Sequence, residues 1–172
     1  MPIDRSYVGR VYPPTAPYEV GREKIREFAD ALNDPSPAYR DPVAARALGY
    51  PDVIAPPTFA IVITLPAGRQ VSHDPDLGID YSRVVHGEQR FVHARPVHAG
   101  DVLQVVVSIA DIRAAGGNDL VTTRAEVTTT DGEPVLIAYG TLVARGPAAA
   151  DSEGASQGSP PPAERTERGG ER

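Results

Sequence analysis

The chain has 172 residues, a length typical of one domain with a single hydrophobic core. It contains no cysteine, which excludes disulfide frameworks, thiol nucleophiles and zinc-finger spacings, and which is typical of a reducing cytoplasm. The formal net charge is −6 and there is no basic stripe, which argues against nucleic acid as a partner because phosphate binding needs clustered positive charge.

Both ends of the chain carry information on location and domain organisation. The amino-terminal residues lack the apolar segment of a signal peptide, and the longest apolar run, residues 59–65, is too short to span a bilayer. We therefore expect a cytoplasmic protein without a membrane span. Residues 147–172 contain no Val, Ile, Leu, Met, Phe, Tyr or Trp, so they cannot offset the entropy of ordering the chain. The sequence predicts one domain over residues 1–146 and a disordered polar tail, either a solvated appendage or a tether.

Two helices are predicted in the first half of the chain. Residues 23–32 have the apolar spacing of one helical face: Ile25, Phe28, Ala29 and Leu32. Pro35 and Pro37 impose extended backbone on the residues before them, so this helix ends near Asn33 and Asp34 begins an irregular loop. Residues 57–65 open with proline and are apolar nearly all round, so we expect a second helix that is buried on all sides.

The second half of the chain has strand-like periodicity. The predicted strands are residues 87–96, 102–110, 120–130 and 134–144. The third alternates apolar with polar side chains, which predicts that one of its faces is exposed to solvent. Asp131-Gly132 predicts a tight hairpin and residues 116–119 a looser one. Residues 9–17 are expected to add a strand at the edge of the sheet, because they contain prolines.

Residues 33–59 resemble the active-site segment of the MaoC-like family of R-specific enoyl hydratases and (3R)-hydroxyacyl dehydratases. That segment reads Gly-Asp-x-Asn-Pro-aliphatic-His-x-Asp, then an alanine-rich turn, Gly-Phe and Ile-Ala-His-Gly. The matching parts of this chain are residues 33–41, Ala44-Ala45, Leu48-Gly49-Tyr50 and residues 54–59. Residues 86–91 and the Arg95-Pro96 to Gly100-Asp101 junction are also similar to the family, so the resemblance covers nearly all of residues 4–146.

The fold that this resemblance implies agrees with the order of the predicted elements. One apolar helix followed by long antiparallel strands is the pattern of an α+β, single hot-dog fold, in which an antiparallel β-sheet wraps around a central apolar helix. A single sheet of this kind leaves an exposed edge and an incompletely covered helix. We therefore expect a homodimer, or a heterodimer with a related chain.

The residues that would catalyse dehydration are only partly present. The chemistry needs a base for the α-proton, an acid for the leaving hydroxyl and donors for the thioester oxygen. The family's catalytic aspartate falls on Asp34, but its histidine falls on Tyr39 and its amide-donating glycine on Pro57. A tyrosine with a pKa near ~10 is a poor base, and proline has no N–H, so that the amide of Thr58 would have to replace it.

Three residues are candidates for a catalytic role, and each has a structural alternative. Asp34 either acts as a carboxylate in the site or stabilises the turn before Pro35. Tyr39 either donates a hydrogen bond or forms a wall of the site. His86 either replaces the missing histidine or is a hydrogen-bonded structural residue.

The candidates for substrate binding lie in two segments. A groove beside Pro57, Thr58 and Phe59 is expected to take the acyl chain, although Pro57 also shapes the start of the helix. Arg95 either meets the phosphate of a carrier or is a solvated surface residue. We expect no metal site, because His93 and His98 are spaced to face opposite sides of a strand.

With tyrosine and proline in place of the family's histidine and glycine, the chain resembles the A-type, non-catalytic subunit of heterodimeric (3R)-hydroxyacyl-ACP dehydratases. The resemblance implies that the chain holds an acyl-ACP or acyl-CoA thioester while a B-type MaoC-like partner carries the Asp/His pair, without any cofactor. Three alternatives stay open: a self-sufficient R-specific enoyl-CoA hydratase, a hot-dog acyl-CoA thioesterase in which Asp34 activates water, and a non-enzymatic acyl-binding scaffold.

Overall fold

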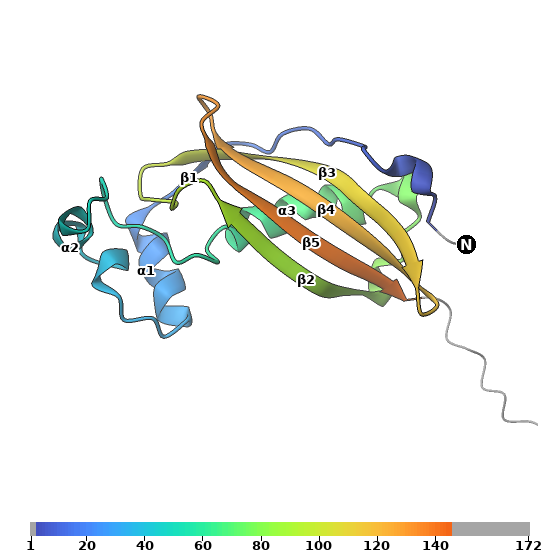
Figure 1. Ribbon diagram of the computed structural model, residues 1–172, viewed down its shortest axis with the longest axis horizontal. Helices are drawn as coiled ribbons and strands as arrows, with labels where there is room; N and C mark the ends of the chain where they lie inside the picture. Colours follow the sequence, from blue (N-terminus) through green and yellow to red (C-terminus); the bar gives the residue numbers. More distant parts are fainter. Residues whose placement is uncertain (1–2, 146–172) are drawn as a thin grey trace, which may run out of the picture.

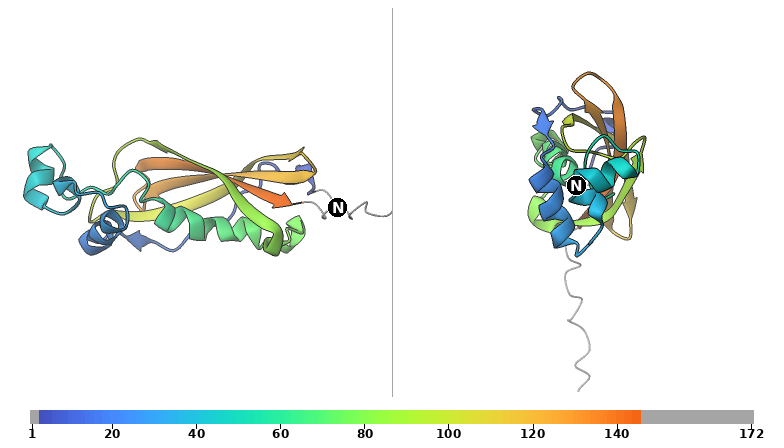
Figure 2. Two further views of the ribbon diagram at one scale, coloured as in Figure 1. Left: turned by 90° about the horizontal axis from the view of Figure 1, so that it is seen from below. Right: turned by 90° about the vertical axis from the view of Figure 1, so that its left-hand side faces the viewer.

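A computed structural model describes residues 3–145. Within this range the chain forms one antiparallel sheet with the strand order β1-β3-β4-β5-β2. The strands are β1 (Tyr18–Glu19), β2 (Val84–His93), β3 (Val102–Ala115), β4 (Asn118–Thr129) and β5 (Pro134–Arg145). Helix α3 (Ile61–Ser72) lies along one face of this sheet, which is the hot-dog arrangement that the sequence predicted (Figures 1 and 2).

The remaining helices lie around this unit. Helices α1 (Arg22–Ala31) and α2 (Pro42–Ala47) gather beyond one end of the sheet (Figure 1). Four short 3₁₀ helices connect the larger elements: η1 (Arg5–Tyr7), η2 (Pro37–Tyr39), η3 (Pro75–Leu77) and η4 (Tyr81–Arg83). Helix α1 matches the predicted helix and buries Ile25 and Ala29. Helix α2 replaces part of the expected alanine-rich turn, because the Asp41 side chain caps it by accepting from Val43 N–H.

The apolar face of the sheet is built by strict alternation along the strands. The buried side chains on β3 and β4 include Leu103, Val105, Val107, Val121, Ala125 and Val127. Register pairs Ala125 with Ala138 and Val127 with Leu136, so the inner positions of β4 and β5 form common rows. On β4 the alternate residues Thr122, Arg124 and Glu126 face outward, and the predicted solvent-exposed face of this strand is therefore confirmed.

Helix α3 differs from its prediction in two ways. It begins at Ile61, after the turns of residues 57–60, and continues through Pro66 to Ser72. It is also buried on one side only, since Leu65 keeps 54% of its surface exposed. Pro66 lies on this exposed side, where the carbonyl that loses its N–H partner can reach water.

The two edges of the sheet are formed differently. Residues 9–17 run along β3 with hydrogen bonds at Gly9, Tyr12 and Thr15, but the regular strand β1 is limited to two residues because prolines interrupt the segment. At the opposite edge β2 pairs only with β5 among the described residues. No helix within residues 3–145 is long and apolar enough to cross a membrane. The predicted tail, residues 147–172, lies outside the described range.

Candidate functional site

A cavity of about 370 Å³ lies where the segment after α2 meets the junction between β2 and β3. We call it the Pro57 cavity. Its walls are mostly apolar, and they bring together the predicted site residues Tyr39, Pro57 and Arg95. The complete lining is Tyr39, Tyr50, Ile54, Ala55, Pro56, Pro57, Ala60, His93, Ala94, Arg95, Pro96 and Val97.

Tyr39 and Asp34 lie on the loop that follows α1. The Oδ1 atom of Asp34 accepts a hydrogen bond of 3.0 Å from Ser36 N–H, which closes the turn around Pro35. Burial raises the pKa of the Tyr39 hydroxyl, and the nearby charge of Asp34 raises it further. Tyr39 therefore remains protonated near neutral pH, where it serves as a hydrogen-bond donor and a wall of the cavity and not as a base.

His93 occupies the place next to Pro57. Its Nε2 atom lies 3.0 Å from the Pro57 carbonyl oxygen, so the histidine donates to this segment from the end of β2. From the sequence His93 was weighed only as a metal ligand, and its place beside Pro57 was missed. The signal was present in the strand register, because His93 pairs with the inward-facing Leu136 and so points to the same face as α3.

Thr58 and Phe59 are not among the residues that line the Pro57 cavity. Phe59 keeps only 1% of its surface exposed and packs edge-to-face on Phe28, with 5.4 Å between the ring centroids. Thr58 is exposed. Phe59 thus supports the cavity from the core, and of the three predicted groove residues Pro57 alone reaches the surface of the cavity.

Every N–H group of the Arg95 guanidinium is hydrogen-bonded within the chain. Its guanidinium donates to both carboxylate oxygens of Asp101 at 2.9 Å, to Glu133 at 2.8 and 3.1 Å, and to the Pro96 carbonyl at 3.0 Å. These bonds use all five of its N–H groups. They raise the pKa of Arg95, and the same contact lowers the pKa of Glu133. The side chain joins the ends of β2 and β5 and has no N–H left for a carrier phosphate.

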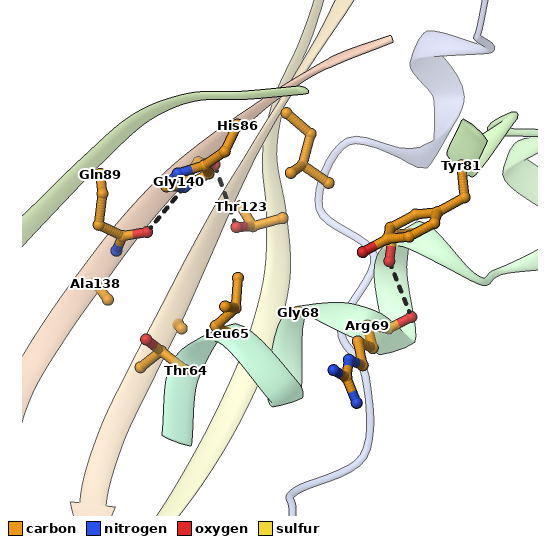
Figure 3. A pocket seen from close by; sticks show the side chains of 13 residues that line it. Thr64, Leu65, Gly68, Arg69, Tyr81, His86, Gln89, Thr123, Ala138 and Gly140 are labelled. Atoms are coloured by element: carbon orange, nitrogen blue, oxygen red, sulfur yellow. Dashed lines mark hydrogen bonds between the residues drawn. The ribbon is translucent and has the colours of Figure 1, made fainter. Parts of the chain in front are cut away.

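His86 belongs to a different cavity. This second space, of about 120 Å³, lies between α3 and the strands β2, β4 and β5, and we call it the Gly140 cavity (Figure 3). His86 Nε2 lies 3.2 Å from the Oε1 atom of Gln89. His86 therefore lies apart from Tyr39 and Pro57, since it lines the Gly140 cavity and they line the Pro57 cavity.

Comparisons with known proteins identify the family of the chain. The family model described as "FAS1-like, dehydratase domain region" matches residues 6–138. A UPF0336 protein of Saccharopolyspora erythraea is 62% identical over 154 residues, which cover 90% of this chain and 98% of the relative. A UPF0336 protein of Streptomyces avermitilis is 61% identical and covers 84% of this chain and 97% of that relative.

Solved structures extend the comparison. The C-terminally truncated HadBC (3R-hydroxyacyl-ACP dehydratase) complex of Mycobacterium tuberculosis contains a chain that is 37% identical, with a TM-score of 0.71 over 80% of this chain and 96% of that one. A MaoC-like dehydratase is 36% identical with a TM-score of 0.77, and the match covers 83% of this chain and 43% of that longer one. The chain therefore belongs to the family of FAS1-like dehydratase domain regions, which have the MaoC-like hot-dog fold and are related to (3R)-hydroxyacyl-ACP dehydratases.

Proposed function

We propose that the chain is the acyl-holding subunit of a (3R)-hydroxyacyl-ACP or -CoA dehydratase, which interconverts a β-hydroxyacyl thioester and a trans-2-enoyl thioester. One observation carries the proposal. The Pro57 cavity lies at the family's active-site segment and is large and mostly apolar, but it presents a protonated tyrosine and a proline where catalysis needs a base and an amide. Such a site can hold a thioester and cannot by itself dehydrate it.

A partner would supply the missing groups. Among the described residues β2 is an edge strand that pairs with β5 alone, and it exposes Val85 and Val92 by 39% and 45%. Helix α3 exposes Leu65, so the molecule offers both a strand edge and exposed apolar side chains. A second MaoC-like chain with an intact Asp/His pair would fit such an edge. The related dehydratase from Mycobacterium tuberculosis is itself described as a complex.

The alternatives are less well supported by the contacts. A thioesterase would need a carboxylate beside the substrate, whereas Asp34 is engaged with Ser36 N–H and is not among the residues lining the Pro57 cavity. A self-sufficient hydratase that used His86 would need it near Tyr39, whereas His86 lies in the other cavity. The histidine that does line the Pro57 cavity, His93, is bonded to the Pro57 carbonyl. A pure acyl-binding scaffold predicts binding without turnover in any pairing. We further propose a cytoplasmic location, because a chain without cysteine is typical of that reducing compartment.

The test follows hydration of a short trans-2-enoyl-CoA by loss of enoyl absorbance. We expect no turnover from the folded chain alone at high concentration. A MaoC-like partner with an intact Asp-x-Asn-Pro-x-His segment should gain activity when this chain is added, beyond the activity of the partner by itself. Robust turnover by the single chain would overturn the subunit assignment, and release of free thiol without loss of the enoyl group would indicate a thioesterase.

A further inference from the structure

Small side chains on α3 and on the sheet leave room for the Gly140 cavity. On α3 the residues that face it recur every four positions, at Thr64, Gly68 and Ser72. On the sheet, Ala125 and Ala138 form a buried row across β4 and β5. The resulting volume of about 120 Å³ is close to the ~150 Å³ of an engineered apolar cavity that takes up benzene.

One row of the sheet wall in this cavity is polar. Register places Thr123 opposite Gly140, and Gly140 opposite Gln89, on the inner face of the sheet. A β-carbon at residue 140 would lie 3.2 Å from Gln89 Oε1, 3.5 Å from Thr123 Oγ1 and 3.8 Å from His86 Nε2. Three polar side chains thus converge on the space that glycine leaves open, beside an apolar row of alanines (Figure 3).

The hydrogen bonds inside this cluster define what it offers to a ligand. Gln89 Oε1 can only accept, so His86 Nε2 carries the proton in their 3.2 Å bond. Within residues 3–145 the Nε2 N–H groups of Gln89 have no hydrogen-bond partner, which leaves them for a ligand. Thr123 Oγ1 donates to the Gly140 carbonyl at 3.2 Å and keeps its lone pairs. The cluster therefore presents a donor and an acceptor side by side, which is the complement of a hydroxyl group.

We propose that the Gly140 cavity binds an oxygen substituent, preferably a hydroxyl, on the distal part of the acyl chain, and that Gln89 sets this preference. The inference rests on the proposed function, in which the thioester lies in the Pro57 cavity. Gln89 and His93 are four residues apart on β2, or roughly 13 Å at about 3.3 Å per residue. An acyl chain that starts beside His93 would bring its far end, and not its β-carbon, to the polar row.

Calorimetric titration of the purified chain tests this preference without requiring turnover. The probes are octanoyl-, decanoyl- and dodecanoyl-pantetheine, each compared with its ω-hydroxy and its β-hydroxy form. At one length we expect the ω-hydroxy thioester to bind roughly three- to tenfold more tightly than the unsubstituted one, the gain of one net hydrogen bond. Gln89→Leu should remove this difference, so that the ω-hydroxy and the unsubstituted thioester of one length bind with equal affinity.

Two further variants complete the design. Gly140→Ala places a methyl group among the three polar atoms and should also remove the preference. Gln104→Leu makes the same chemical change on β3, outside the cavity, where Gln104 donates to the Thr15 carbonyl, and it should keep the preference. Circular dichroism confirms that each variant is folded.

The outcomes separate the two proposals. Equal affinity for ω-hydroxy and unsubstituted chains at every length, or a preference that survives in Gln89→Leu, would overturn this inference alone. A preference for the β-hydroxy form without one for the ω-hydroxy form would contradict the distal placement. Failure of every thioester to bind would remove the proposed function and this inference with it.

Discussion

His93 Nε2 lies 3.0 Å from the Pro57 carbonyl oxygen, so a histidine from β2 holds the segment around Pro57. Position 57 is the one that the resemblance assigns to the glycine whose amide binds the thioester oxygen. The contact joins residues 36 positions apart in the chain. It orients the carbonyl of Pro57 toward the protein, and it places a titratable ring in the Pro57 cavity beside the wall that contains Tyr39. The role of this histidine can be decided by substitution.

We expect His93 to position Pro57 and not to act as a base. His93→Gln keeps a donor for the Pro57 carbonyl and should change the turnover of the partnered enzyme by less than about threefold, whereas removal of a general base costs roughly a hundredfold or more. His93→Leu loses the bond and should lower the free energy of unfolding by about 1 kcal/mol. The measurements are enoyl absorbance and urea unfolding. A hundredfold loss in His93→Gln with normal stability would identify a catalytic base.

Restoring the family's histidine at position 39 should not create a self-sufficient enzyme. Tyr39→His supplies an imidazole, but the Asp34 carboxylate stays bonded to Ser36 N–H and Pro57 still has no amide to donate. Hydration of a short enoyl-CoA by the single chain should remain at background. Tyr50→His, on the wall of the same cavity, is the matched control for a new imidazole. Turnover in Tyr39→His and not in Tyr50→His would show that one residue separates this chain from a complete hydratase.

Local patterns predicted much of the fold. The apolar spacing of residues 23–32 located α1, and the alternation in residues 120–130 located the buried face of β4. The start of α3 was misplaced, because a proline that favours a first helical turn equally suits the turns that residues 57–60 form.

The site was harder to predict, because its contacts link distant parts of the chain. The partner of Arg95 in the next hairpin, Glu133, is 38 positions away, and no spacing rule reveals that the two side chains meet. His93 could be placed in the cavity only once the register with β5 was known. The motif around Asp34 and Tyr39 pointed to a segment that now lines a cavity through Tyr39, and the role of that segment stays a prediction. The face on which His86 lies depended on the bulge between His86 and Glu88, which the sequence pattern did not reveal.

Phe59 should contribute to stability far more than to binding. Phe59→Ala empties a fully buried position against Phe28 and should lower the free energy of unfolding by about 3–5 kcal/mol. Leu48→Ala is the control, because Leu48 is 64% exposed, and it should cost less than about 1 kcal/mol. Urea unfolding measures both. A small loss of stability together with weaker thioester binding would instead show that Phe59 contacts the acyl chain, as the sequence predicted.

Arg95 should likewise prove structural. Arg95→Met leaves Asp101, whose side chain is only 3% exposed, without its bidentate partner and should cost roughly 3 kcal/mol. Arg113→Met breaks an exposed pair with Asp111 and should cost less than about 1 kcal/mol. Affinity for acyl-CoA, measured by calorimetry on folded Arg95→Met, should be unchanged. Weaker binding of acyl-CoA, with unchanged binding of acyl-pantetheine, would instead show that Arg95 contacts the nucleotide phosphates.

Tyr12 should make the protein less stable in alkali. Burial, and then its 2.7 Å hydrogen bond to the Asp74 carboxylate, raise the pKa of the Tyr12 hydroxyl above its usual value. The folded state therefore holds this proton more tightly than the unfolded state, whose tyrosine titrates near pH ~10. The stabilisation is complete below that pH. It is lost as the pH rises further, by at most about 1.4 kcal/mol per pH unit.

Urea unfolding of the wild type and of Tyr12→Phe, between about pH 8 and pH 11, measures this contribution. Other groups titrate in the same range in both proteins, so the difference between the two curves isolates Tyr12. The wild type should lose stability more steeply than Tyr12→Phe above about pH 10, because phenylalanine has no proton to lose. Tyr139→Phe is the matched control for loss of a tyrosine hydroxyl, since Tyr139 packs under the Arg90 guanidinium at 4.3 Å and takes no part in the bond to Asp74. Equal slopes in the wild type and Tyr12→Phe would mean that the Tyr12–Asp74 bond does not favour the protonated hydroxyl in the folded state.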